Sequence, residues 1–270
     1  MSITGVTRGL TLACHPGPTL AVTTFTALLA ASAGHTPARG ALVTSAVLAG
    51  QLSIGWSNDL VDAARDRAVN RSDKPVARGD VSEGTVRAAT AVALVACIVL
   101  SLACGIASAT VHLLLGVASG WAYNLWFKRT VVSPLPYAVA FAALPAVVTL
   151  ALPDPVWPDG WVMLTGALLG TGAHLLNALP DLADDEATGV RGLPHRLGPV
   201  VVRWLAPAVL LAASVVAALG RGFDLPGVAL LGVCVVLAAV AVQGRGKVPF
   251  VAAVGIALAN VVSLVVRQTP

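Results

Sequence analysis

Apolar segments of about twenty residues recur along the whole chain, and they constrain its fold more than any other feature. Nine can be marked, at 18–34, 40–61, 85–107, 109–127, 134–152, 161–179, 202–220, 226–243 and 248–266. Each is long enough to cross a hydrocarbon core of about 30 Å. Each must be helical, because lipid offers the backbone no hydrogen-bond partner. The sequence therefore predicts an all-α integral membrane protein, with nine transmembrane helices in one domain spanning 1–270.

Composition agrees with this fold class and excludes others. The chain is 57% hydrophobic and 11% charged, and its mean hydropathy is +0.84, values typical of a membrane protein rather than a soluble domain. The net charge of +4 does not indicate nucleic-acid binding, because no aromatic and basic surface segment accompanies it. Basic loops on one side of a membrane explain this charge better.

The distribution of Lys and Arg predicts the orientation. With nine helices, the N-terminus and every even-numbered loop share one side. Fourteen of the seventeen basic residues fall there, which leaves Arg39, Arg221 and Arg267 on the other. The positive-inside rule makes the basic side cytoplasmic. The loops after the second and sixth helices, 62–84 and 180–201, then lie in the cytoplasm, and the membrane is expected to be a bacterial-type plasma membrane.

The end of the second apolar segment carries a cluster of acids. Asn58, Asp62 and Asp66 are spaced four residues apart, and Asp59 lies beside them. On a helix this spacing stacks the side chains on one face. Carboxylates this close repel each other unless a cation lies between them. The cluster therefore indicates a metal site at the membrane surface.

A second copy of the pattern follows the sixth apolar segment. Asn177, Asp181 and Asp185 repeat the spacing of Asn58, Asp62 and Asp66, while Ala178 stands where the first copy has Asp59. Both copies are on the predicted cytoplasmic side, and a basic stretch follows each of them. Two copies in one frame indicate a single site shared between two halves of the chain.

Two facing carboxylate clusters favour hard divalent cations. Mg²⁺ takes oxygen ligands and usually completes its coordination with water and phosphate oxygens. Basic residues beside both clusters suit a polyanion bridged by those metals. The substrate indicated is a diphosphate at the membrane surface, with an apolar tail among the helices. If its first carbon is allylic, loss of diphosphate would give a carbocation.

These motifs resemble those of the UbiA superfamily of intramembrane prenyltransferases. Asn58–Asp66 and the stretch 70–76 look like that family's NDxxDxxxD and NRxxRP elements, and Asp181–Asp185 resembles its second DxxxD motif. Tyr123 with Lys128 and Arg129 is similar to a further Tyr…Lys element of the family. The resemblance spans essentially the whole chain. It implies nine helices around a central cavity, with cytoplasmic cap loops, and prenyl transfer that depends on two or more Mg²⁺ ions.

The resemblance also implies residue roles. Asn58, Asp62 and Asp66 would hold one metal with support from Asp59, and Asp181 and Asp185 would hold the other. Residues expected to contact the substrate are Arg65, Arg71, Lys74, Lys128, Arg129 and Asn177, with Tyr123 close to the reacting carbon. The chain departs from the family in having Lys74 where Arg is frequent. It also has His15 where many members have a basic residue before Pro. Asp184 and Glu186 are additional acids without an assigned role.

Three functions remain open from sequence. The first is transfer of a prenyl group to a small acceptor of unidentified class, aromatic molecules being among the candidates. The second is a terpene cyclase on the same scaffold that needs no acceptor. The third is a cation-coupled transporter, although its ionisable groups should lie near mid-membrane. His174, one turn before Asn177, would either bind an acceptor or be a packed helix histidine.

Overall fold

The chain folds entirely into helices within the residues that the computed structural model describes, which are 3–69, 71, 73–187, 189–222 and 224–266. In chain order the α-helices are α1 (Ile3–Ala13), α2 (Pro16–Ser32), α3 (Pro37–Ala68), α4 (Pro75–Arg78), α5 (Glu83–Ala103), α6 (Ile106–Val111), α7 (Ala118–Leu125), α8 (Leu135–Thr149), α9 (Gly160–Ala178), α10 (Leu182–Ala187), α11 (Leu193–Gly220), α12 (Leu225–Gln243) and α13 (Val248–Val266). Three short elements join them: the π-helical η1 (His112–Val117) and the 3-10 helices η2 (Phe127–Arg129) and η3 (Leu179–Asp181). The predicted all-α class is confirmed.

Each of the nine predicted segments is helical, but several boundaries differ. α3 continues to Ala68 instead of ending at residue 61, because its last residues are polar and a search for apolar runs stops before them. α11 begins at Leu193, but its backbone is non-helical at Gly198, so the helix that follows this kink starts close to the predicted residue 202. Helix α1 was not predicted at all. The first acidic motif therefore lies wholly on a helix and not partly in a loop.

Helix ends are fixed by local chemistry. Thr36 caps α3 by accepting a hydrogen bond from Arg39 N, and Pro37 begins the helix with a suitable φ angle. At the same end of the molecule, the Arg39 side chain donates to Ala151 O at 3.0 Å and to Cys104 O at 3.1 Å. A cation that hydrogen-bonds carbonyls left free at the ends of α5 and α8 also complements their dipoles.

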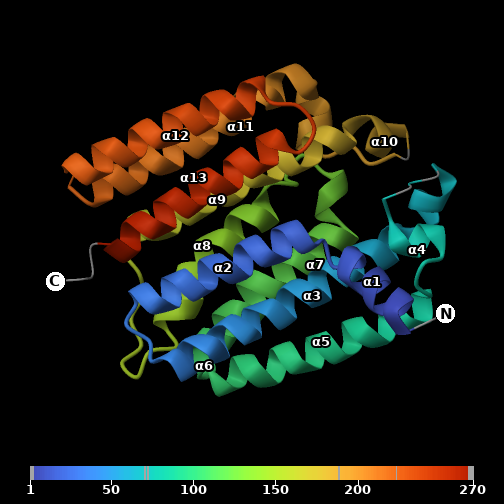
Figure 1. Cartoon of the computed structure of the whole chain (residues 1–270), viewed down its shortest axis with the longest axis horizontal. Coiled ribbons are helices and arrows are strands. Elements are labelled where there is room, and N and C mark those ends of the chain that lie inside the picture. The colour runs from blue at the N-terminus through green and yellow to red at the C-terminus, as the bar shows by residue number, and fades with distance from the viewer. Residues whose placement is uncertain (1–2, 70, 72, 188, 223, 267–270) are drawn as a thin grey trace.

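The long helices form a closed ring. α3 packs against α2 and α5, and α6 joins α5 to α8. α8 then packs against α9, α9 against α11, α11 against α12, and α12 against α13, which contacts α2 and closes the ring. Figure 1 shows α9, α11, α12 and α13 on one side of the bundle and α2, α3, α5 and α6 on the other. The short helices α1, α4 and α10 gather at the same end of the bundle, where both acidic motifs lie.

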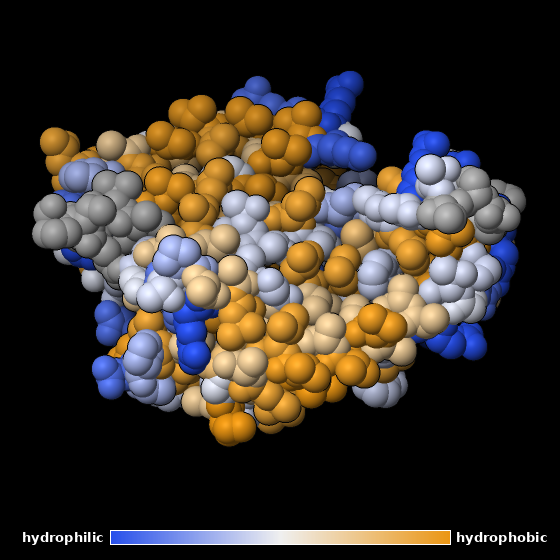
Figure 2. Space-filling model, turned by 60° about the horizontal axis from the view of Figure 1, so that its bottom comes forward, coloured by the Kyte–Doolittle hydropathy of each residue, from blue (hydrophilic) through white to orange (hydrophobic). Residues whose placement is uncertain are grey.

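The surface and core are those of a protein in a bilayer. Many apolar side chains face outward, among them Leu20, Val92, Ile106, Val200 and Leu225, each more than 60% exposed. Figure 2 shows apolar residues across the middle of one face and hydrophilic residues toward both ends. Such a large exposed apolar area suits lipid and not water. The chain is an integral membrane protein.

The number of membrane crossings is only partly settled by helix length. Within the described part of the chain, five helical stretches are long and apolar enough to cross: Glu83–Ala103, Ile106–Leu125, Gly160–Asp181, Leu193–Gly220 and Leu225–Gln243. α2 has 17 residues and α8 has 15, so α8 is about 22 Å long. α3 carries the polar motif. The ninefold crossing stays a prediction.

A small apolar cavity lies inside the bundle between α2, α8, α9 and α13. Its volume is about 50 Å³, and its lining includes Phe25, Phe141, Leu169 and Asn260. It lies among side chains of the main core. The larger central cavity expected from the family resemblance stays a prediction.

Candidate active site

The three carboxylates of the first motif are buried on one stretch of α3. Asp59, Asp62 and Asp66 have 1%, 3% and 2% of their surface exposed. Acids are almost never buried this fully unless they are paired. Because α3 continues through Asp66 to Ala68, the spacing of four residues places Asp62 and Asp66 on one helix face, as predicted.

Asp62 is held by two cations from different parts of the chain. Lys128, which lies on η2 and is 5% exposed, donates to Asp62 Oδ1. Arg65, one turn along α3, places Nη2 2.9 Å from Asp62 Oδ2. Both oxygens of this carboxylate are thus engaged. The structure brings together the first motif and Lys128, the two elements expected to share a substrate.

Arginines of the first motif region also reach the second motif. Arg65 Nη2 lies 3.5 Å from Asp185 Oδ1 on α10. Arg71 Nη2 lies 3.1 Å from Asp181 Oδ1 on η3. Each guanidinium thus spans two parts of the chain that are more than a hundred residues apart. The two motifs form one cluster, with cations between them.

The charge environment shifts the acidity of groups outside the membrane helices. The Arg71 guanidinium, which donates two 2.8 Å hydrogen bonds to Asp73, lowers the pKa of that carboxyl to about 2. Burial has the opposite effect on Asp185 and raises its pKa, although Arg65 partly offsets this. Asp185 is therefore harder to ionise than an ordinary aspartate.

His15 was missed as a site residue, and the structure places it in the cluster. Its Nε2 atom lies 3.1 Å from Lys74 Nζ and 3.6 Å from Asp59 Oδ1. Lys74 Nζ also donates to Asp59 Oδ1 at 3.0 Å. His15 has φ of 55°, a left-handed conformation that a non-glycine residue rarely adopts. The sequence signal was the His15-Pro16 step between α1 and α2.

The corner before His15 is packed too closely to move independently. A Cβ atom on Gly55 of α3 would lie 2.4 Å from Cys14 O, so only glycine permits this approach. Thr19 Oγ1 donates to Cys14 O at 2.8 Å, and Trp56 Nε1 donates to Leu10 O at 2.8 Å. Trp56 therefore fastens α1 to α3. These contacts hold the strained His15 backbone in place.

The donor set fits a hard divalent cation. Within the described residues, no group of three or more His, Cys, Asp or Glu side chains gathers as ready metal ligands. Arginine and lysine nitrogens lie between the carboxylates instead. However, Asp59 Oδ2 and Asp66 Oδ2 are buried and have no hydrogen-bond partner. Buried carboxylate oxygens without a donor are suited to Mg²⁺, which prefers oxygen ligands.

The second motif does not copy the geometry of the first. α9 ends at Ala178, Pro180 lies in η3, and α10 begins at Leu182, so the three residues of the pattern lie on three elements. Asn177 is exposed, whereas Asn58 donates to Asn124 Oδ1 at 3.1 Å. The equivalence predicted for the two asparagines is therefore wrong in geometry. Pro180 explains the break because it cannot continue a helix hydrogen-bond ladder.

Several other predicted residues lie at the edge of the cluster. Arg129 is exposed. Glu186 is also exposed, and its Oε1 lies 3.4 Å from Arg191 Nη2. The side chain of Asp184 lies outside the described residues. None of these positions changes the core of the cluster.

An aromatic group lies beside the carboxylates. Tyr123 of α7, Tyr137 of α8 and His174 of α9 have ring centroids between 4.9 and 5.5 Å apart. His174 is 2% exposed, and its Nε2 lies 3.1 Å from Ser133 Oγ. His174 is thus packed and hydrogen-bonded. Sequence reasoning missed Tyr137 and Ser133, because neither belongs to a charged motif.

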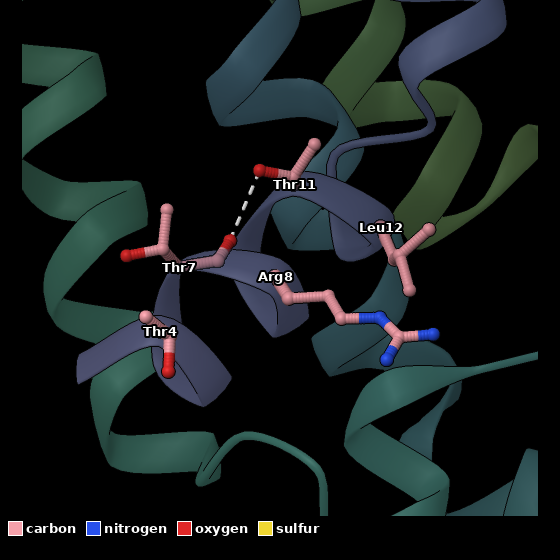
Figure 3. A pocket seen from close by; sticks show the side chains of 5 residues that line it. All are labelled: Thr4, Thr7, Arg8, Thr11 and Leu12. Atoms are coloured by element: carbon pink, nitrogen blue, oxygen red, sulfur yellow. Dashed lines mark hydrogen bonds between the residues drawn. The ribbon is translucent and has the colours of Figure 1, made fainter. Parts of the chain in front are cut away.

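A separate groove runs along α1. Its volume is about 430 Å³, and Figure 3 shows the lining side chains Thr4, Thr7, Arg8, Thr11 and Leu12, with Thr11 Oγ1 donating to Thr7 O at 3.0 Å. All five belong to one helix, and none is a carboxylate. The groove does not belong to the acidic cluster.

Comparison with known proteins agrees with this arrangement. The model of the UbiA prenyltransferase family matches residues 20–264. The chain belongs to the UbiA prenyltransferase family. It is 34% identical to the bacteriochlorophyll synthase 33 kDa chain of Cereibacter sphaeroides over 185 residues. This match covers 63% of the present chain. The match spans 59% of the length of that curated relative.

Solved structures of family members share the fold. A UbiA homologue from Aeropyrum pernix K1 has a TM-score of 0.75 and 18% identity, with 93% of this chain and 98% of that chain covered. A UbiA homologue from Archaeoglobus fulgidus bound to GPP and Mg²⁺ has a TM-score of 0.70 and 14% identity, with 96% and 99% covered. At these identities the likeness concerns the fold alone. The all-α UbiA-like fold expected from the sequence is confirmed.

Proposed function

We propose that this protein transfers a prenyl group from a prenyl diphosphate to a small acceptor, with Mg²⁺ as cofactor. The observation that carries the proposal is the Arg65 side chain, which lies 2.9 Å from Asp62 and 3.5 Å from Asp185. It joins two acidic motifs at a single place. Each motif alone would be an unexplained cluster of acids, whereas together they would form a binding site for a metal-bound diphosphate.

The residues divide into metal ligands and diphosphate ligands. Oxygens of Asn58, Asp62, Asp66, Asp181 and Asp185 would hold Mg²⁺, and Asp59 would support them. The structure of the Archaeoglobus fulgidus homologue was solved with GPP and Mg²⁺, which supports this assignment. When bound, Mg²⁺ would neutralise the diphosphate and make it a better leaving group.

The basic residues have a second role in this scheme. Lys128, Arg65, Arg71 and Lys74 neutralise the carboxylates in the structure described above. With Mg²⁺ held by the carboxylates, these same side chains would be available to donate hydrogen bonds to phosphate oxygens. Arginine suits this because its planar fork binds two oxygens at once. Charge stabilisation of the departing diphosphate is then the main catalytic effect.

The aromatic group supports the carbon end of the reaction. Tyr123 lies on α7, just before η2, whose Lys128 donates to Asp62, and we therefore place its ring beside the diphosphate site. An electron-rich ring face next to the reacting carbon would favour an allylic cation. The surrounding helices supply apolar contacts for the prenyl chain.

We infer the membrane arrangement from the same features. The whole chain would form one domain of nine crossings, with shorter helices such as α8 shielded by their neighbours. The end that carries α1, α4 and α10 would face the cytoplasm, since fourteen of seventeen basic residues lie on that side of the predicted topology. A water-soluble diphosphate headgroup would reach the site from there.

The acceptor is the least constrained part of the function. The name of the Cereibacter sphaeroides relative, bacteriochlorophyll synthase, makes a tetrapyrrole one acceptor to test. Aromatic acids are a second class. The site residues described so far select the donor and not the acceptor.

The experiment is a transfer assay with the full chain in lipid vesicles. Labelled geranylgeranyl or farnesyl diphosphate is supplied with Mg²⁺, with and without each acceptor class, and products are separated by chromatography. We expect a prenylated acceptor that disappears when Mg²⁺ is chelated. A cyclic hydrocarbon formed without acceptor would contradict transfer and establish the cyclase alternative.

A further inference from the structure

His174 carries a buried ring nitrogen that the protein does not satisfy. Its side chain is 2% exposed, and Nδ1 has no hydrogen-bond partner. A buried polar atom without a partner is costly and uncommon in native proteins. The other ring nitrogen, Nε2, lies 3.1 Å from Ser133 Oγ. The question is what Nδ1 binds in the working enzyme.

The contacts of Ser133 determine which nitrogen carries the proton. Ser133 is fully buried, and its Oγ accepts a hydrogen bond from Leu193 N at 3.1 Å. Donation of the hydroxyl proton to His174 Nε2 would satisfy the buried hydroxyl as a donor too, and we adopt this arrangement. A nitrogen that accepts a hydrogen bond is unprotonated, so the imidazole proton is on Nδ1. The unsatisfied atom is therefore an N–H donor.

The surroundings of this donor are aromatic and close to the diphosphate site. Tyr137 lies 4.9 Å from the His174 ring, tilted by 39°, and Tyr123 lies 5.5 Å away at nearly a right angle. Tyr123 lies on α7, the helix that leads into η2, whose Lys128 donates to Asp62. The donor thus lies between flat rings, next to the place where the reacting carbon of a prenyl diphosphate would be.

We propose that His174 Nδ1–H binds a carbonyl or carboxylate oxygen of the prenyl acceptor and orients it toward the reacting carbon. This rests on the proposed function and adds the chemical class of its second substrate: a flat, conjugated molecule with such an oxygen. The aromatic neighbours favour a planar body through offset or edge contacts. The N–H group requires an oxygen that accepts a hydrogen bond. His174 is in this scheme a residue that binds and positions the acceptor.

Two substitutions of His174 test the roles of its two ring nitrogens separately. The amide nitrogen of asparagine takes nearly the position of Nδ1, whereas the amide oxygen of glutamine can take nearly the position of Nε2 and accept the hydrogen bond from Ser133. His174→Asn therefore keeps a donor for the acceptor and loses the contact with Ser133. His174→Gln keeps the Ser133 contact and loses the donor. His112→Asn is a matched control, because His112 is also a buried helix histidine bonded to a serine, here through Nδ1 at 2.8 Å from Ser101 Oγ, and asparagine keeps a polar atom at that position.

The variants are assayed in vesicles with labelled geranylgeranyl diphosphate, Mg²⁺ and three acceptors: a hydroxybenzoate, a dihydroxynaphthoate and a magnesium tetrapyrrole carboxylate. KM is measured for acceptor and donor separately. We expect His174→Gln to raise the acceptor KM about tenfold, the effect of one lost hydrogen bond in a buried site, while the donor KM is unchanged. His174→Asn should raise the acceptor KM less, and His112→Asn should not change it.

The proposal is overturned if His174→Gln has the acceptor KM of the natural protein, or if both KM values change together in both variants. It is also overturned if only an acceptor without a carbonyl or carboxylate oxygen is prenylated, such as a glycerol phosphate. If the natural protein prenylates nothing but still releases diphosphate, the proposed transfer itself fails, and the inference fails with it. If only the His174 proposal is wrong, the natural protein still prenylates an acceptor. The failure of this proposal can therefore be distinguished from the failure of the proposed function.

Discussion

At the scale of single residues, the site is a set of buried acids paired with lysine and arginine side chains. Asp62 is paired with Lys128 and Arg65, and all three are largely buried. Removing one partner of a buried pair leaves an unpaired charge and costs about 3–5 kcal/mol. Alanine at Asp62 would therefore confound stability with function. Amide substitutions, which keep the shape, are the better probes.

Asp185 offers a test of stability at this scale. Its pKa is raised by burial, so its ionised form is less favourable in the folded protein than in the unfolded chain. A raised pKa of an acid makes the folded state less stable at pH above that pKa, and the penalty is relieved as pH falls through it. We expect Asp185→Asn to raise the thermal midpoint of the metal-free protein at neutral pH.

The midpoint is measured in detergent with a chelator, across a pH series. The increase in thermal midpoint caused by Asp185→Asn should become smaller as the pH falls. This decrease should begin at a pH above 3.8, the ordinary pKa of an aspartate, because the pKa of Asp185 is raised. Asp154→Asn, at an exposed position, is the control and should change nothing. A lower midpoint for Asp185→Asn at neutral pH would mean that its contact with Arg65 outweighs burial.

At the scale of elements, the loop between α10 and α11 lies close to the connection between α7 and α8. A Cβ atom on Gly192 would lie 2.6 Å from Lys128 O and 2.9 Å from Ser133 Oγ. This contact places the chain that follows the second motif against the segment that carries Lys128. Glycine is required here for the close approach and not for an unusual φ angle, since its φ is −69°.

Gly192→Ala should push this loop away from Lys128. We expect a loss of about 1–3 kcal/mol in stability, typical of overpacking, and a fall in prenyl diphosphate turnover larger than the stability loss explains. Thermal midpoint and turnover are measured together. The control is Gly232→Ala on α12, where a Cβ atom would meet nothing within 4 Å. Equal behaviour of the two variants would show that the contact has no function.

The elements also show how far the sequence predicts this structure. Apolar runs located all nine main helices, because lipid imposes helices on such runs. They missed α1 and the polar end of α3, since these contact water or the site and carry no long apolar run. The spacing of the acidic motifs predicted their pairing, but Pro180 divides the second one. His15, Ser133 and Tyr137 were missed because only the folded chain brings them to the cluster.

At the scale of the whole molecule, the ring of helices fixes both motifs at one end of the bundle. α3, which carries the first motif, and α9, which precedes most of the second, belong to different parts of the ring (Figure 1). The motifs are joined across it by Arg65 and Arg71. If the two motifs form one site, the second motif must be as necessary for diphosphate release as the first, although it is more exposed and less regular.

The most direct test is the rate of Mg²⁺-dependent diphosphate release from geranylgeranyl or farnesyl diphosphate by Asp181→Asn. The Asp181 side chain is 41% exposed, so the substitution should leave the thermal midpoint nearly unchanged. Asp73→Asn is the matched control, because Asp73 also pairs with Arg71 but belongs to neither motif. We predict that Asp181→Asn lowers the rate by about 100-fold or more, because it would weaken the hold on the Mg²⁺ that stabilises the charge developing on diphosphate, while Asp73→Asn retains it. Natural activity in Asp181→Asn would contradict a site shared by the two motifs.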